Sequence, residues 1–320
     1  MKFETGEPNL YVFAQTLLEC ARKDRDIIVV TSDSRGSGKL TPFGEEVPEQ
    51  IVEVGIAEQN LVGIAAGLAA CGKKVFAVSP ASFLTARALE HIKNDVCYSN
   101  HPVKLVGISA GVSYGALGAT HHSLHDVAAL RAMDNIDIVV PADNFEARAC
   151  VRAAVNHAKP LYIRFGKRPL PHINDQTAQY VIGKATILKD GQDVAFIATG
   201  ETVHQALDAA YALESDGLTA RVLSMHTLAP LDEKAILASA RRCRVLITVE
   251  EHSVAGGLGE AVAALLLQNS IILPFAIVAI PNNYTTTGSQ LEIFNHYGIS
   301  AVGLKKTAQT LIKQVQRNVT

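Results

Sequence analysis

The alternation of short apolar runs with helical patterns is the feature that most constrains the fold of this chain. Runs rich in β-branched residues are separated by amphipathic or small-residue helical patterns, and they predict strands at 27–31, 74–78, 103–109, 136–140 and 161–164. The run at 136–140 is continuously apolar, as a strand covered on both faces requires. This rhythm predicts parallel βα units and therefore an α/β fold.

A break in this pattern predicts two domains. Between residues 165 and 180 the sequence FGKRPLPHINDQTAQY contains two prolines and a polar run, which block both a helix and a central strand. The alternation then resumes, with strands expected at 194–199, 218–224, 244–249 and 275–280. A length of 320 residues also favours two domains. We predict one domain at 1–168, a linker at 169–180 and a second domain at 181–320, each a mostly parallel sheet covered by helices.

Charge and cysteine content exclude several classes of function. The 29 basic and 31 acidic residues are interspersed and give a formal net charge of -2, so no basic stripe is available for nucleic acid. The five cysteines are widely spaced and form no CxxC pair, which argues against a disulfide framework and against a zinc site. We therefore expect a cytoplasmic protein that holds no metal of its own and binds no nucleic acid.

One stretch has the length of a membrane span. Residues 261–280 carry no charge, but Gln268, Asn269, Ser270 and Pro274 interrupt the middle. We interpret the stretch as a helix that ends near Gln268, followed by a buried strand at 275–280. The first residues, MKFETGEP, also lack the pattern of a signal peptide. No membrane association is expected.

The segment 52–78, VEVGIAEQNLVGIAAGLAACGKKVFAV, predicts a short strand, a tight turn and a helix that begins near Glu58. The helix has a small, apolar face, which is typical of a helix built to be buried. Glu58 has an ordinary interpretation as an acid in the first helical turn, where the dipole stabilises an anion by about 0.3–1 kcal/mol. A buried carboxyl without a cation instead has a raised pKa and acts as a proton donor. The sequence leaves both open.

EVGIAEQN followed by a Gly/Ala-rich helix resembles the thiamine-pyrimidine domain of transketolases, deoxyxylulose phosphate synthase and the beta subunits of 2-oxoacid dehydrogenases. The resemblance implies that Glu58 hydrogen-bonds the aminopyrimidine ring of thiamine diphosphate and favours its imino tautomer, which removes the thiazolium proton. SPASFLTARALEHIKND at 79–95 resembles the second motif of the family, with Phe83 at the aromatic that stacks on the pyrimidine. Taken alone, Phe83 would be a core aromatic. Ile56 and Asp33 are further cofactor contacts that the resemblance implies.

The segment SAGVSYGALGATHHSLHD at 109–126 is rich in glycine and histidine. Two of its histidines are four residues apart, but no cysteine or paired carboxylate completes a metal site. ATHHSLHD instead resembles the Thr-His-Gln stretch of the family, which places His121 as the catalytic histidine that contacts the donor sugar. Two substrate-site positions depart from the family: Leu117 replaces an Asp and Ser109 replaces a His. Both changes indicate an unusual sugar.

The resemblance also suggests where an anion binds. Ser37, in the SDSRGSGKL loop, and Lys167, in YIRFGKRP, fall where the family binds the terminal phosphate of the sugar, and Arg164 is a further candidate, as are Arg35 and Arg87. Taken singly, each basic residue is more often a solvated charge or a surface pair of little energetic worth. Phosphate and sulfonate would satisfy these groups equally well.

EEHSVAGGLGEAV at 250–262 resembles the C-terminal domain of transketolases. Its glycines open a helix, which first suggests a phosphate site. The family uses this domain for packing and subunit contacts, which implies that Glu250, Glu251 and His252 are structural.

The chain lacks one part of the full transketolase architecture. No Gly-Asp-Gly motif followed by a metal-binding Asn occurs in the sequence. The resemblance therefore implies an N-terminal transketolase subunit as partner, which binds Mg²⁺ and the diphosphate and shares thiamine diphosphate in an α2β2 heterotetramer. Our first hypothesis is the C-terminal subunit of a split transketolase that transfers a two-carbon ketol unit from a ketose to an aldose. The beta subunit of a 2-oxoacid dehydrogenase and a non-catalytic scaffold remain alternatives, and the donor is left open among pentose phosphates, apulose phosphate and sulfosugars.

Overall fold

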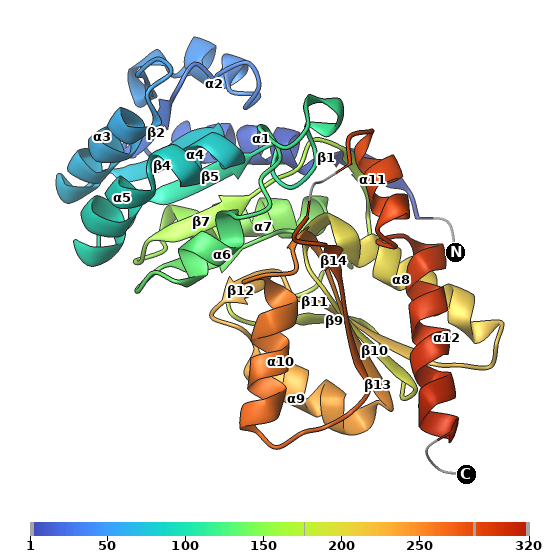
Figure 1. Ribbon diagram of the computed structural model, residues 1–320. Helices are drawn as coiled ribbons and strands as arrows, with labels where there is room; N and C mark the ends of the chain where they lie inside the picture. Colours follow the sequence, from blue (N-terminus) through green and yellow to red (C-terminus); the bar gives the residue numbers. More distant parts are fainter. Residues whose placement is uncertain (1–2, 176, 284–285, 318–320) are drawn as a thin grey trace.

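The computed structural model describes residues 3–175, 177–283 and 286–317, and for residues 316 and 317 it describes the backbone alone. It contains two main sheets (Figure 1). Within these residues the first sheet has seven strands in the order β12-β6-β7-β5-β4-β2-β3. All neighbouring strands are parallel except β12 and β6. The strands are β2 (Ile27–Thr31), β3 (Ile51–Glu53), β4 (Lys74–Pro80), β5 (Lys104–Ile108), β6 (Asp137–Val139), β7 (Leu161–Arg164) and β12 (Thr227–Ala229).

Helices cover both faces of this first sheet, which explains why strands such as β2 (IIVVT) are buried throughout. One face packs on α1 (Asn9–Ala21), α2 (Thr41–Glu46) and α7 (Asn144–Val155). The opposite face packs on α3 (Glu58–Ala70), α4 (Ala81–Arg87), the π-helical η2 (Ile92–Tyr98) and α6 (Asp126–Arg131), with the short α5 (Leu89–His91) between α4 and η2. Short 3-10 helices are η1 (Pro48–Gln50) and η3 (Gly115–Leu117).

The second sheet has five strands within the described residues, in the order β14-β13-β10-β11-β9. These are β9 (Thr186–Lys189), β10 (Val194–Ala198), β11 (Ala220–Ser224), β13 (Val245–Ser253) and β14 (Phe275–Ile280), and only β9 is antiparallel to its neighbour. One face packs on α8 (Val203–Glu214), α11 (Gln290–His296) and α12 (Ala301–Arg317). The other packs on α9 (Glu233–Arg242) and α10 (Leu258–Gln268), and the 3-10 helix η4 (Gly200–Thr202) follows β10.

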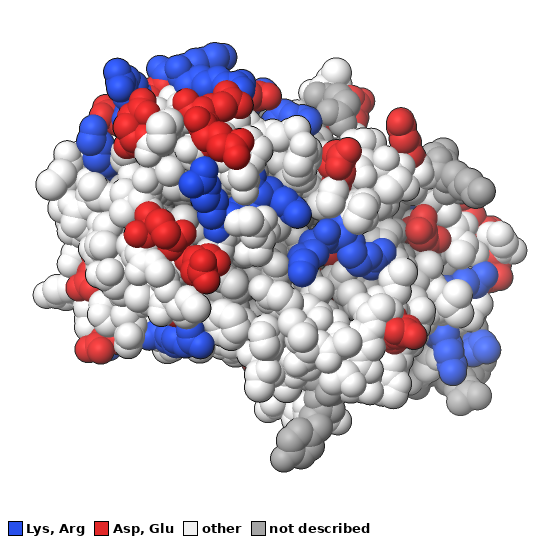
Figure 2. All heavy atoms as spheres, turned by 90° about the horizontal axis from the view of Figure 1, so that it is seen from above, with Lys and Arg blue, Asp and Glu red and all other residues white. Residues whose placement is uncertain are grey.

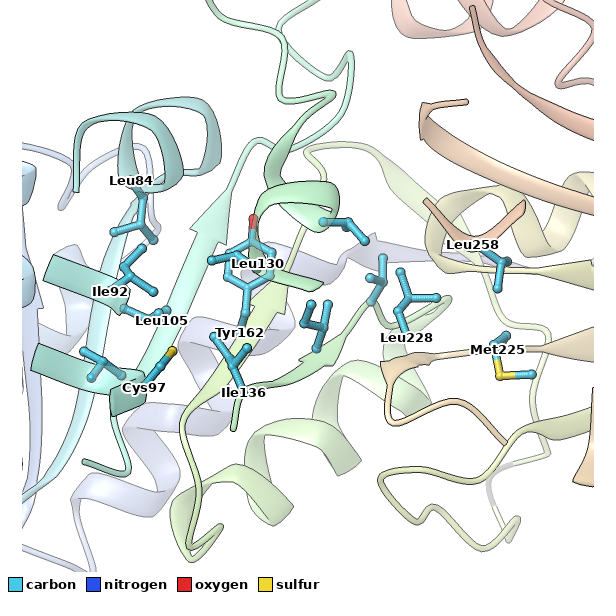
Figure 3. Close-up of a cluster of buried hydrophobic side chains, with 14 of the residues drawn as sticks. Leu84, Ile92, Cys97, Leu105, Leu130, Ile136, Tyr162, Met225, Leu228 and Leu258 are labelled. Carbon is cyan, nitrogen blue, oxygen red and sulfur yellow. The ribbon is translucent and has the colours of Figure 1, made fainter. Parts of the chain in front are cut away.

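The two halves of the chain share a hydrophobic cluster. Figure 3 shows this cluster running from Leu84 and Ile92, through Tyr162, to Met225 and Leu258 in the second half. Backbone hydrogen bonds also join the halves, because β12 comes from the second half but pairs antiparallel with β6 of the first sheet. The two halves are therefore joined by apolar packing and by a sheet hydrogen-bond ladder.

The expected α/β architecture is confirmed, and the central strands lie where the apolar runs predict them. The helix expected near Glu58 begins at that residue, and the helix expected to end near Gln268 is α10. The two-stranded sheet of β1 (Thr5–Pro8) and β8 (Pro169–Pro171) was not expected, and β8 lies inside the predicted linker. The division at 169–180 remains a proposal. Within the described residues, no helix combines the length and the apolar character needed to cross a bilayer.

Candidate active site

The predicted site residues lie at one edge of the first sheet. Except for Arg164, which ends β7, they follow the carboxyl ends of β3, β2, β4, β5 and β7, which are adjacent and parallel. Parallel strands with helical crossovers bring such segments together, which is why open α/β sheets bind ligands at this edge. Five segments lie there: the loop after β2, the turn between β3 and α3, the start of α4, the loop at 109–125 and the segment at 165–168.

Glu58 is the first residue of α3, and its side chain is 3% exposed. Arg87, at the end of α4, donates from Nη1 to Oε2 of Glu58 at 2.8 Å. Of the two interpretations that the sequence leaves open, the buried carboxyl without a cation does not describe Glu58, because α4 brings a guanidinium to it. No hydrogen bond from a described residue reaches Oε1, so one carboxyl oxygen is paired and the other can receive a ligand.

A continuous line of ring and cation contacts extends from this pair. The guanidinium carbon of Arg87 lies 4.8 Å from the ring centroid of Phe83. The Phe83 ring meets the His121 ring edge-on with centroids 5.4 Å apart, and His121 meets Tyr114 in the same way at 5.2 Å. Lys167 Nζ then lies 4.7 Å from the Tyr114 centroid. Four of the predicted residues, Glu58, Phe83, His121 and Lys167, are thus linked through Arg87 and Tyr114.

The loop after β2 carries Asp33 and Ser37, both of which are exposed. Ser32 Oγ donates to Ser79 Oγ at 2.8 Å, which holds this loop against the end of β4. Glu53 Oε1 accepts hydrogen bonds from Asp33 N at 2.7 Å and from Gly55 N at 2.9 Å. One carboxylate therefore fixes both the loop and the turn before α3.

The remaining predicted positions differ strongly in exposure. Ile56, in the turn held by Glu53, is 73% exposed, and Leu117, in η3, is 58% exposed. Ser109 is 1% exposed and follows β5 directly, with a φ of 53°. Its Oγ has no hydrogen-bond partner among the described residues. Ile56 and Leu117 are large apolar side chains that this chain alone leaves open to solvent.

Arg164 lies inside the protein, away from the line of contacts. Its Nε donates to Asp126 at 2.8 Å, and its Nη2 donates to the carbonyls of Ser123 at 3.0 Å and Glu251 at 2.8 Å. Tyr162 also donates to Asp126, at 2.7 Å. Burial alone would raise the pKa of Asp126, but the charge of Arg164 opposes it and that pKa is lowered. These contacts favour a structural role for Arg164 over the predicted role in substrate binding.

Glu250 already occupies the glycine-rich start of α10. Its carboxylate accepts from Leu258 N and Gly259 N, each at 2.8 Å. These are the amides that a phosphate would need. Burial raises the pKa of Glu250 to about 7. The structure thus agrees with a packing role for this segment.

Sequence reasoning missed Tyr114 and Glu53, and it considered Arg87 only as an anion-binding candidate. Arg87 and Glu58 are both charged and lie at helix ends, but only the adjacency of α3 and α4 reveals the pair. Among the described residues, no group of three or more His, Cys, Asp or Glu side chains could hold a metal ion. On the face in Figure 2, Lys and Arg side chains lie beside Asp and Glu side chains and form no continuous basic surface.

The residues present suit the aminopyrimidine of thiamine diphosphate. Glu58 offers an unpaired oxygen at the start of a helix, Phe83 offers a partly exposed ring, and Ile56 offers an exposed aliphatic surface. The set combines one carboxyl oxygen that can hydrogen-bond the ring with two apolar side chains that can pack against it, as the binding of a planar heterocycle requires.

Two family profiles cover most of the chain. Residues 10–172 match the transketolase pyrimidine-binding domain, and residues 183–304 match the transketolase C-terminal domain. The chain belongs to the transketolase family. The first match ends and the second begins inside or next to the stretch at 169–180.

Similar proteins agree with this assignment. An apulose-4-phosphate transketolase subunit of Phocaeicola vulgatus is 47% identical over 303 residues, which are 94% of this chain and 96% of that one. The 6-deoxy-6-sulfo-D-fructose transketolase subunit SqwH of Clostridium sp. (strain MSTE9) is 33% identical, covering 94% of each chain. A solved structure described as a split gene transketolase, inactive beta4 tetramer, is 34% identical with a TM-score of 0.87, covering 96% of this chain and 99% of that one. The chain is an enzyme chain of the transketolase type, and family membership implies dependence on thiamine diphosphate.

Proposed function

We propose that this chain is the C-terminal subunit of a split transketolase, which transfers a two-carbon ketol unit from an anionic ketose to an aldose. The observation that carries the proposal is the line of contacts from Glu58 through Arg87, Phe83, His121 and Tyr114 to Lys167. It runs from a carboxyl suited to the cofactor, past an imidazole, to a cation suited to the terminal anion of the sugar.

Each residue of this line has a distinct task in the proposed reaction. When bound, thiamine diphosphate supplies the carbon nucleophile of ketol transfer. Glu58 hydrogen-bonds the pyrimidine through Oε1, while Arg87 fixes its other oxygen. Phe83 stacks on the ring and His121 hydrogen-bonds the hydroxyls of the donor. Ile56 and Asp33 complete the cofactor contacts from the turn before α3 and from the loop after β2.

The far end of the line is proposed to bind the anion of the donor. Lys167 is exposed, and the Tyr114 ring holds its ammonium group over the loop that carries His121. Ser37, also exposed, adds a hydroxyl from the loop after β2. A relative named for apulose 4-phosphate is 47% identical, against 33% for one named for a sulfosugar, so we place a branched ketose phosphate first among the donors. The apolar Leu117 and the small Ser109 support an unusual sugar.

The exposed face of α3 is evidence that a partner chain binds there. A side chain at Gly63 or Gly67 would meet no described atom within 4 Å, and Ala70 on the same face is exposed. Apolar helix faces of this kind are normally covered in an assembled protein. We propose an N-terminal transketolase subunit as the partner, with Mg²⁺ and the diphosphate bound on its side, in a cytoplasmic α2β2 assembly.

The proposal is tested by ketol transfer to glyceraldehyde 3-phosphate, with this chain combined with the N-terminal subunit, Mg²⁺ and thiamine diphosphate. The donor panel contains xylulose 5-phosphate, apulose 4-phosphate and 6-deoxy-6-sulfofructose. We expect transfer only when both chains are present. Decarboxylation of pyruvate without ketol transfer would instead indicate a 2-oxoacid dehydrogenase component.

The variant Glu58→Gln tests the mechanism in the same assembly. We expect kcat to fall by about 10²–10⁴-fold, the usual contribution of a positioned acid or base. The matched control is Glu90→Gln, because Glu90 is an exposed glutamate in α5 near the same segment. Unchanged kcat in Glu58→Gln would show that this carboxyl has no part in the reaction.

A further inference from the structure

The second half of the chain holds the loop that carries His121. Glu251, near the end of β13, is 4% exposed, and its Oε1 accepts a hydrogen bond from Val112 N at 2.8 Å. Val112 O in turn accepts from Gly115 N at 2.8 Å, and the ring nitrogen Nε2 of His122 lies 2.9 Å from Gly115 O. The contact therefore continues along the loop to the residue beside His121.

A second carboxylate from the same half packs against the segment that carries Lys167. Glu201, in η4, is 6% exposed, and a Cβ at Gly166 would overlap its carboxylate. A Cβ at Gly111 would overlap the carboxylate of Glu251 in the same way. In both places the absence of a side chain lets the backbone of the first half approach a buried carboxylate.

Gln290 joins the two carboxylates. Its Nε2 donates to Oε1 of Glu251 at 2.7 Å and to Oε2 of Glu201 at 2.8 Å. Burial raises the pKa of both glutamates, and the charge of Glu201 raises that of Glu251 further, whereas Arg164 lowers both and Arg168 lowers that of Glu201. Glu201 Oε1 has no hydrogen-bond partner among the described residues. Two buried carboxyl groups and a buried amide therefore lie between the two halves, where apolar packing alone would need no polar side chain.

We propose that Glu251 and Glu201, joined through Gln290, position the loop of His121 relative to the segment of Lys167. The C-terminal half would thereby set the spacing between the reacting end and the anion-binding end of the donor site. The consequence for turnover rests on the proposed function, because it uses the roles given there to His121 and Lys167.

Loss of the acceptor should displace the loop more than it destabilises the fold. In Glu251→Ala, Val112 N and Gln290 Nε2 both lose a buried acceptor. A displacement of about 1 Å in a positioning element can cost about 10²-fold in rate. Glu251→Gln keeps an oxygen for Val112 N, so the conservative variant should rescue the function if position rather than charge matters.

The test uses the assembled enzyme with Glu251→Ala, Glu251→Gln and the control Glu146→Ala. Glu146 is also a buried carboxyl that links the two halves, through Ser224 Oγ at 2.7 Å, but its hydrogen bonds join it to Ala142, Asp143, Asn174 and Ser224, outside the His121 loop and the Lys167 segment. We expect kcat/KM for the ketose donor to fall by about 10–100-fold in Glu251→Ala, with a raised donor KM. In Glu251→Gln it should stay within about threefold of wild type, and thiamine diphosphate affinity should be unchanged in both.

Hydrogen–deuterium exchange of the peptide spanning residues 109–118 provides a readout that does not depend on turnover. We expect faster exchange in Glu251→Ala and wild-type exchange in Glu146→Ala, even though both variants lose stability. Equal effects of the two alanine variants on exchange and on donor KM would overturn the proposal. If the wild-type assembly shows no ketol transfer, the proposed function fails, while the exchange comparison still decides whether Glu251 holds the loop.

Discussion

Separate replacement of Arg164 and Lys167 should show that the first residue is needed for stability and the second for donor binding. The two residues are three positions apart at the end of β7, and both were predicted to bind the anion of the substrate. Arg164 is 6% exposed and paired with Asp126, whereas Lys167 is exposed and contacts the ring of Tyr114. We expect Arg164→Met to destabilise the chain and Lys167→Met to weaken donor binding.

The magnitude for Arg164→Met follows from what the change leaves behind. Asp126 is 0% exposed and would keep only the Tyr162 hydroxyl as a hydrogen-bond donor from a side chain. The carbonyls of Ser123 and Glu251 would also lose a donor. Breaking a buried ion pair on one side costs about 3–5 kcal/mol. For a chain of 320 residues this corresponds to a melting temperature lower by roughly 4–8 °C.

Lys167→Met should behave in the opposite way. An exposed substitution of this kind changes the free energy of unfolding by less than about 0.5 kcal/mol. Loss of a charge-assisted hydrogen bond to the donor should raise the donor KM about tenfold or more. The assays are thermal melting of the purified chain and steady-state kinetics of the assembled enzyme. If Arg164→Met keeps the wild-type melting temperature and loses donor affinity, the structural role given to Arg164 is wrong.

Two further changes test the loop and the buried carboxyls. Tyr114→Leu removes the ring beside Lys167, and a cation–ring contact of this kind contributes about 0.5–1 kcal/mol. The donor KM should therefore rise about two- to fivefold. An unchanged donor KM would show that Tyr114 is not part of the site. Burial and the nearby Asp143 raise the pKa of Glu146 from its usual 4.5 to about 7, so the folded chain holds a proton that the unfolded chain has lost in this range. The free energy of unfolding contributed by this group therefore falls as pH rises from about 4.5 to about 7, by roughly 3 kcal/mol in total. Urea unfolding of Glu146→Gln should lack this part of the pH dependence, and identical pH profiles for both chains would contradict it.

The local sequence pattern was sufficient to predict the central strands and the helix that begins at Glu58. The apolar runs at β2 and β7 have the bounds expected of them, because such runs can be buried only between two layers of helices. The short antiparallel strands β9 and β12 were missed, since their pairing depends on neighbours in space rather than on their own sequence.

The site was predictable where a motif names a residue and unpredictable where contacts decide its role. Glu58, Phe83 and His121 stand in motifs, and the structure places Phe83 between Arg87 and His121. The burial of Arg164 depends on Asp126, which lies 38 positions earlier in the chain, and no local pattern reveals this partner. Long-range ion pairs of this kind are a property of the packed fold.

The crossing of β12 into the first sheet limits how this protein can be recombined. A chain truncated at residue 180 would lose Thr227–Ala229, the strand that pairs with β6, and β6 would become an open edge. Exposed edges of this kind template association with other chains. Exchange of whole halves between relatives should therefore succeed only when β12 and the adjoining part of the shared core come from compatible parents.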